Sequence, residues 1–177
     1  MEVVYTAQID SPVGPLRLVS TARGLGYVEL PHASGRGLEG WLRRSLPGAR
    51  AESGFAPNRG AAVQLVEYFE GKRTAFDLAL DPRGTPFQRE VWRALLAIPY
   101  GETRSYREVA SAVGRPAAVR AVGSANGTNP LAVVIPCHRV IAADGSLGGY
   151  GGGLELKARL LAMERSRSPG PRLLSPD

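Results

Sequence analysis

The sequence is poor in the residues that build disulfide bonds, metal sites and membrane spans. Among its 177 residues are one cysteine, Cys137, and two histidines, His32 and His138. One cysteine excludes an internal disulfide bond and a thiolate-rich zinc site, and two distant histidines argue against a histidine-based site, so we expect no bound metal. No apolar run approaches the length that spans a bilayer, and the first residues lack the basic and apolar segments of a signal peptide. These absences predict a cytoplasmic protein with no membrane partner.

Lysine is also scarce, although the chain is basic overall. The net charge is +6, and all the basic residues except Lys72 and Lys157 are arginine. A positive balance favours a polyanionic partner such as nucleic acid. A biased genomic base composition would supply the arginines equally well, so the charge alone is a modest indication. With 44% apolar and 21% charged residues, the chain fits one globular domain or two small ones.

The first half of the chain is predicted to form a compact unit of strands and helices. Runs of β-prone residues between turn residues predict an antiparallel meander over 3–9, 16–21 and 25–30. Helical spacing predicts helices over 34–46 and 59–70, the second with a core face of Ala62, Val63, Leu65, Val66 and Phe69. Residues 47–57 are predicted as a loop, and alternation over 76–80 predicts one more strand. No catalytic constellation is visible in this unit, and His32 is interpreted as a surface or packing residue.

The second half has sharper helix signals and begins after a polar segment, Asp81-Pro82-Arg83-Gly84, which we predict as a domain boundary. Thr85-Pro86-Phe87-Gln88 is a capping box that opens a helix ending near Pro99, and Ser105-Tyr106-Arg107-Glu108 is a second one. Gly114 stops the second helix, and another helix is predicted over 117–126. The spacing is that of a helix-turn-helix, a weak signal by itself.

The helix over 117–126 is composed almost entirely of small residues, with Arg120 as its one charge. A helix that reads bases in a major groove would carry several long polar side chains. Small side chains allow a backbone to approach a shallow or narrow groove closely. They equally allow tight packing against a neighbouring helix, and the helix alone does not separate these interpretations.

An apolar stretch follows that is cut by a proline just before the cysteine. Residues 132–135 are predicted as a short buried strand that stops or kinks at Pro136, which leaves Cys137 at the end of a rigid element. A glycine-rich segment over 142–153 would then permit close approach to a ligand, although it lacks any phosphate-loop fingerprint. The last helix is predicted over 154–165.

Chemistry at Cys137 depends on how its thiol is ionised. A cysteine with an ordinary pKa of about 8.5 is a few per cent thiolate at neutral pH, and a histidine backed by a carboxylate would remove its proton. Glu164 shares a helix face with Leu160 and Leu161, so it needs a partner, with His138 or Arg139 as candidates. Three alternatives stay open: Glu164 is exposed at the helix end, Cys137 is a small buried hydrophobe, or Cys137 and His138 point to opposite faces of a strand and communicate through a turn or a water.

The motif Pro-Cys-His-Arg-Val lies inside VVIPCHRVI, with SY, RAVG and NP segments upstream and GGYGGGLELK downstream. Together these segments resemble the O6-alkylguanine-DNA alkyltransferase family from about Thr85 to Glu164, and SPVGPLRL and TARGLGYVEL resemble its smaller domain. The resemblance implies an α+β protein: a ribonuclease-H-like α/β domain over 1–82, a mainly helical winged-helix domain over 83–165, and a disordered tail over 166–177.

The resemblance also implies a DNA-repair activity and a role for each matching residue. The chain would bind duplex DNA through its helix-turn-helix in the minor groove, rotate an O6-alkylguanine out of the stack, and transfer the alkyl group to Cys137 in one irreversible turnover. No cofactor is implied. His138 would take the thiol proton through a water, Glu164 would support the imidazole, and Asn129 would hold the active-site turn. Tyr106 would donate toward the leaving base or turn the flanking phosphate.

Further residues would contact the DNA and the extruded base. Arg120 would fill the gap left by the base, on a surface with Tyr106, Ala118, Ala121, Ser124, Ala125 and Asn126, and the pocket would be lined by Val140, Gly148, Tyr150 and Gly151. The family often has serine at the position of Gly151, so one hydrogen bond to the base is expected to be missing. The zinc-ligating cysteines that some relatives carry in the first domain are absent. We expect a monomer; the sequence leaves open the range of alkyl groups, activity on O4-alkylthymine and cooperative binding.

Two other classes of function remain in view. A pure binding module, either a lesion flagger or a winged-helix regulator, would bind DNA without any covalent change at Cys137. A cysteine hydrolase would turn over repeatedly, but the expected Cys–His geometry and the lack of an evident oxyanion site argue against it.

Overall fold

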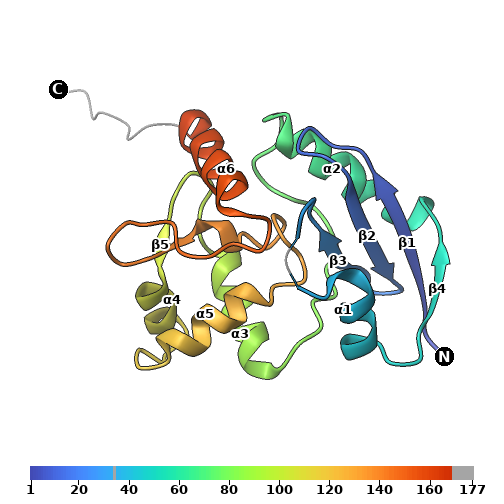
Figure 1. Ribbon diagram of the computed structural model, residues 1–177, viewed down its shortest axis with the longest axis horizontal. Helices are drawn as coiled ribbons and strands as arrows, with labels where there is room; N and C mark the ends of the chain where they lie inside the picture. The colour runs from blue at the N-terminus through green and yellow to red at the C-terminus, as the bar shows by residue number, and fades with distance from the viewer. Residues whose placement is uncertain (34, 169–177) are drawn as a thin grey trace.

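The computed structural model describes residues 1–33 and 35–168, which form an N-terminal half built on a sheet and a C-terminal half built mainly from helices (Figure 1). The α+β fold class predicted from the sequence is confirmed. One continuous hydrophobic core runs through both halves, from Leu16 and Leu65 to Val91, Ile135 and Leu160. No helix among the described residues is long and apolar enough to cross a membrane.

The N-terminal sheet has the strand order β3-β2-β1-β4. Strands β1 (Val3–Ile9), β2 (Leu16–Thr21) and β3 (Gly24–Glu29) form the predicted antiparallel meander. Strand β4 (Arg50–Ser53) pairs parallel to β1 and lies in a segment predicted as a loop. The sequence gives no signal for this strand, because a short edge strand with little buried surface shows no apolar alternation.

Helices α1 (Gly37–Ser45) and α2 (Arg59–Phe69) accompany this sheet, and a short 3₁₀ turn (Ala56–Asn58) leads into α2. The predicted core face of α2 is confirmed at Ala62, Leu65 and Phe69, whereas Val63 is 49% exposed and Tyr68 is fully buried. The prediction of a strand over 76–80 was wrong. The Gln64 side chain bonds both the amide and the carbonyl of Asp77, at 2.8 and 2.9 Å, so a ladder cannot use them, and only Leu80 bridges to Leu25.

The C-terminal half contains α3 (Pro86–Leu96), β5 (Arg104–Ser105), α4 (Tyr106–Ala112), α5 (Val119–Gly127), β6 (Val140–Ile141) and α6 (Leu154–Arg167). Both predicted capping boxes are confirmed. The Thr85 and Ser105 hydroxyls each accept from the backbone amide three residues on, and their own backbone amides donate to the side chains of Gln88 and Glu108. Helix α6 continues to Arg167, so the predicted tail over 166–177 does not begin at 166. The rest of that tail, 169–177, lies outside the described residues.

The two halves meet where α6 lies beside α2, at the top of the view in Figure 1. Arg167, near the end of α6, donates to the carbonyl of Glu70 at the end of α2. Buried between the helices, the Tyr68 hydroxyl reaches Glu164. The N-terminal half therefore contacts the helix that carries the predicted carboxylate.

Candidate active site

Cys137 follows a tight turn, not the strand predicted over 132–135. The amide of Ile135 donates to the Leu131 carbonyl at 2.8 Å, and Val133 has a φ of 73°. A β-branched residue in this left-handed region is strained, at a cost of about 1–3 kcal/mol. Cys137 then begins a 3₁₀ turn over Cys137–Arg139. The predicted strand was wrong because hydrogen bonds within residues 129–135 close a turn at Val133, in a conformation that valine by itself avoids.

Asn129 holds this turn from inside. Its Nδ2 donates to the Ile135 carbonyl at 2.8 Å, and its Oδ1 accepts from the Leu131 amide at 3.0 Å. Both ends of the turn are therefore tied to one side chain, which places Cys137 by hydrogen bonds to the backbone.

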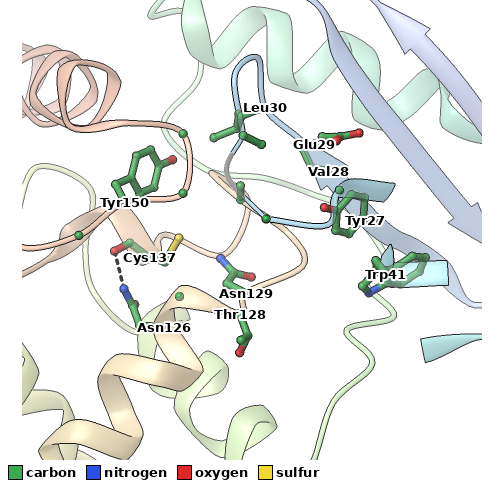
Figure 2. Close-up of a pocket in the computed structure, with 18 of the residues that line it drawn as sticks. Tyr27, Val28, Glu29, Leu30, Trp41, Asn126, Thr128, Asn129, Cys137 and Tyr150 are labelled. Carbon is green, nitrogen blue, oxygen red and sulfur yellow. Dashed lines mark hydrogen bonds between the residues drawn. The ribbon is translucent and has the colours of Figure 1, made fainter. Parts of the chain in front are cut away.

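Cys137 faces a cavity of about 630 Å³ that lies between the two halves (Figure 2). Cys137, Asn129 and Tyr150 stand at one end, and Tyr27 and Trp41 of the N-terminal half stand at the other. The cysteine is 6% exposed. Ligand pockets of small molecules fall in the range of about 300–1,000 Å³, so a base-sized group fits in front of the thiol.

The thiol is in an environment that by itself disfavours ionisation. Burial raises the pKa of Cys137, while a hydrogen bond from Asn129 and the positive charge of Lys157 act in the opposite direction. A neighbouring base is therefore needed to take the proton.

His138, Arg139 and Glu164 form a buried charge cluster next to Cys137. Glu164 Oε1 lies 2.8 Å from His138 Nε2 and 2.9 Å from Arg139 Nη2, and Glu164 Oε2 accepts from Arg139 Nε at 2.8 Å. Burial by itself would raise the pKa of Glu164, but hydrogen bonds from His138 and Arg139 outweigh it and lower the pKa to about 2. Glu164 is thus an ionised, fully buried carboxylate with both candidate partners, not an exposed residue at the helix end.

The histidine presents its other nitrogen as a free acceptor. Because an ionised carboxylate only accepts, the 2.8 Å contact requires the proton on Nε2. His138 Nδ1 is buried and has no partner among the described residues. Burial lowers the pKa of His138, which favours the neutral imidazole. Cys137 and His138 lie in a 3₁₀ turn, so the strand assumed for this pair was wrong, whereas a turn, one of the two expected routes between them, is present.

Lys157 anchors the glycine-rich segment that covers the cysteine side of the cavity. Its Nζ, fully buried on α6, donates to the carbonyls of Val140, Leu147 and Gly149 at 2.6, 2.5 and 3.1 Å. Gly148, with a φ of 70°, lies where any Cβ would approach the Tyr106 hydroxyl to 2.9 Å. The segment therefore packs closely on Tyr106.

Two of the four predicted pocket residues line the cavity described above. Tyr150 and Gly151 line the cavity. Val140 and Gly148 do not line the cavity: Val140 is fully buried in β6, and Gly148 packs against Tyr106.

The predicted DNA-contacting residues divide in the same way between surface and interior. Arg120, Ala121 and Ser124 are exposed on α5, and Ala118 and Tyr106 are partly exposed. Ala125 and Asn126 are buried, since the carbonyl of Ala125 accepts from Trp92 and Asn126 donates to the Cys137 carbonyl. These two residues are not on the exposed face that the sequence suggested.

Two family models together match almost the whole chain. The "6-O-methylguanine DNA methyltransferase, ribonuclease-like domain" matches residues 4–82, and the "6-O-methylguanine DNA methyltransferase, DNA binding domain" matches 86–166. The chain belongs to the 6-O-methylguanine DNA methyltransferase family.

Individual members of the family resemble the chain along nearly its full length. A methylated-DNA–protein-cysteine methyltransferase of Mycobacterium tuberculosis is 49% identical over 170 residues, 94% of this chain and 96% of the relative. One from Methanosarcina barkeri is 47% identical over 163 residues, 92% of this chain and 98% of the relative. The solved structure of Mycobacterium tuberculosis OGT in complex with DNA is similar with a TM-score of 0.77 and 46% identity, covering 95% of this chain and 96% of the other.

The site of this 6-O-methylguanine DNA methyltransferase family member contains groups that the sequence analysis missed. Tyr68 joins the charge cluster from the N-terminal half, where no catalytic constellation was expected. Lys157 also went unnoticed, although a lysine in line with Leu160, Leu161 and Glu164 was a usable signal, because a charge on an apolar helix face needs partners. Tyr68 gave no comparable signal, since a tyrosine on a core face is ordinary.

Proposed function

We propose that this methyltransferase repairs duplex DNA by moving the alkyl group from O6 of guanine onto Cys137 Sγ, once per protein molecule. The observation that carries this proposal is a lone cysteine facing a cavity large enough for a base, with a neutral histidine and a buried carboxylate beside it. The relatives' name, methylated-DNA–protein-cysteine methyltransferase, describes the same chemistry.

In the proposed reaction the thiol proton passes to His138 Nδ1, through a water, as Cys137 becomes the nucleophile. The sulfur forms a bond to the alkyl carbon while the bond from that carbon to O6 breaks. Guanine leaves with the electron pair and takes up a proton, which the Tyr106 hydroxyl supplies and then regains from solvent. Glu164 stabilises the imidazolium that His138 becomes, and Asn129 keeps Cys137 in place.

The product explains why the protein acts once. A thioether carbon attached to Cys137 has no carbonyl for water to attack, in contrast to the thioester of a cysteine hydrolase. The alkyl group therefore stays on the protein, and no cofactor or metal takes part.

For DNA binding we propose that α5 lies in the minor groove. Arg120, Ala121 and Ser124 form its exposed face, and small side chains there let the backbone come close to the DNA. The O6 atom of a stacked guanine is out of reach, so the base must rotate into the cavity, and Arg120 fills the gap. We propose that the protein does this as a cytoplasmic monomer; O4-alkylthymine is a second substrate to be tested in the same assay.

The test is intact-protein mass after incubation with duplex DNA containing O6-methylguanine. The wild-type mass should rise by one methyl group at most, with the group on Cys137, and Cys137→Ala should bind the DNA and stay unmodified. An unchanged wild-type mass together with DNA binding would favour the pure binding module instead. Repeated turnover of an ester or amide by the same preparation would establish a hydrolase.

A further inference from the structure

Tyr68 lies on α2 of the N-terminal half, yet its hydroxyl is part of the charge cluster of the C-terminal half. The side chain is fully buried, and its O–H donates to Glu164 Oε1 at 2.5 Å. The same hydroxyl oxygen lies 3.3 Å from His138 Nε2. The two residues that meet are separated by 96 positions in the sequence.

Three donors from two elements share one oxygen of Glu164, which itself lies on a third element, α6. Oε1 accepts from Tyr68 on α2, from His138 Nε2 in the 3₁₀ turn and from Arg139 Nη2 in the same turn. Each donor draws negative charge toward itself, so each weakens the hydrogen bonds and the electrostatic attraction between the carboxylate and the other donors. Tyr68 is a donor at any working pH, because burial and the charge of Glu164 raise its pKa far above the ordinary value of 10.

The strength of the electrostatic attraction between Glu164 and the His138 ring decides whether His138 can act as a base. A carboxylate that concentrated its charge on His138 would hold the ring as an imidazolium, with both nitrogens protonated and nothing left to accept a proton. A carboxylate that shares its charge with Tyr68 and Arg139 leaves the ring neutral, with the proton on Nε2 and the lone pair on Nδ1. The other ionisable groups that face the ring are the same in either case: Cys137 and Arg139 in its own turn, Lys157 on α6, and Tyr150.

We propose that the Tyr68 hydroxyl is a positioning group that divides the charge of Glu164, and so keeps His138 as the neutral Nε2–H imidazole whose Nδ1 takes the Cys137 proton. This inference rests on the proposed function of Cys137. It makes the N-terminal half a part of the proton-transfer machinery and not only one wall of the cavity.

The test compares Tyr68→Phe with Tyr100→Phe in the full-length protein. Tyr100 is a matched control because its ring lies 6.3 Å from that of Tyr68 and its buried hydroxyl has no hydrogen-bond partner among the described residues. The first readout is the titration of the His138 ring by nitrogen NMR, with His32→Gln to assign the two histidines. The second is the rate at which iodoacetamide alkylates Cys137 as a function of pH, which needs no DNA.

With its donor removed, Tyr68→Phe should raise the pH at which His138 gains its proton by on the order of one unit, the size expected for one lost charged hydrogen bond. His138 must be neutral to accept the thiol proton. On acidification, Tyr68→Phe should therefore lose the reactivity of Cys137 at a higher pH than the wild type does. Tyr100→Phe should leave both midpoints at the wild-type values.

Several outcomes would overturn the proposal. Equal midpoints of the His138 titration in Tyr68→Phe and Tyr100→Phe would leave Tyr68 a packing residue. A lower alkylation rate of Cys137 at every pH, with no shift of the pH midpoint, would lead to the same conclusion. A wild-type His138 that carries its proton on Nδ1, or on both nitrogens, at neutral pH would overturn it even if the Tyr68 variant did not fold. Absence of methyl transfer from DNA to the wild-type protein would instead defeat the proposed function, while the histidine titration still decides the role of Tyr68.

Discussion

At the scale of single residues, Lys157 shows how one buried charge can shape a loop. Its ammonium group gives its three donors to three backbone carbonyls, so it compensates for its burial without a carboxylate partner. The acceptors span the segment from β6 to the cavity, which fixes a chain rich in glycine that has little conformational preference of its own. The same charge lies close enough to Cys137 to favour its thiolate.

Replacement of this lysine should loosen the segment and slow the reaction. We expect Lys157→Met to lower the single-turnover rate of methyl transfer by about tenfold or more, because buried carbonyls left unpaired cost about 1–3 kcal/mol each. Hydrogen exchange of residues 142–153 should become faster. Lys72→Met is the control, since Lys72 is exposed and pairs with Glu70. Wild-type exchange rates in Lys157→Met would contradict this account of the loop.

At the scale of elements, α5 combines a buried and an exposed face with different tasks. Val122, Ala125 and Asn126 are buried against the rest of the C-terminal half, and the carbonyl of Ala125 accepts from Trp92 at 2.8 Å. The interpretation of tight packing holds for the buried face. The exposed face carries Ala121, Ser124 and Arg120 and is the one that we propose approaches the DNA groove.

A negative charge on that smooth face should repel DNA phosphates. We expect Ala121→Glu to weaken binding to duplex DNA by about tenfold or more, a loss of about 1.4 kcal/mol. Ala158→Glu on α6 makes the same charge change at another exposed helical alanine and should have a much smaller effect. Fluorescence anisotropy at fixed salt measures both, and equal losses in the two variants would remove α5 from the proposed interface.

At the scale of the whole molecule, the cluster around Glu164 joins the two halves. The carboxylate receives Tyr68 from the N-terminal half and His138, Arg139 and the amide of Gly101 from the C-terminal half. Its pKa is about 2 in the folded protein against an ordinary value of 4.5. A depressed pKa contributes stability that is complete above the unfolded value and is lost as the pH falls through the folded value.

Acid should therefore unfold the protein through this cluster. We expect the urea midpoint of the wild type to fall between about pH 4.5 and pH 2. Glu164→Gln should be less stable at neutral pH by about 3–5 kcal/mol, because Arg139 loses its buried partner, and should lose less on acidification. Glu155→Gln, at an exposed position of the same helix, should keep the wild-type profile. A Glu164→Gln profile parallel to that of the wild type would show that other carboxylates govern acid unfolding.

The amino-acid sequence by itself determined the elements whose causes lie within a few residues. The capping boxes at Thr85 and Ser105 set the starts of α3 and α4, and β-prone runs between turn residues set the first three strands. The motif around Cys137 was sufficient to predict the family and the chemistry. The conformations of edge strand β4 and of residues 76–80 were not predicted correctly. Pairing with β1 decided the first, and hydrogen bonds with Gln64 decided the second.

Only the tertiary structure decided how the site is assembled. The choice of both His138 and Arg139 as partners of Glu164 and the three carbonyls on Lys157 depend on contacts between separate elements. Tyr68 is the extreme case, since its partner lies 96 residues away. Local patterns report which face of a helix is apolar, whereas the direction and partner of a buried polar group follow from what the rest of the chain packs against it.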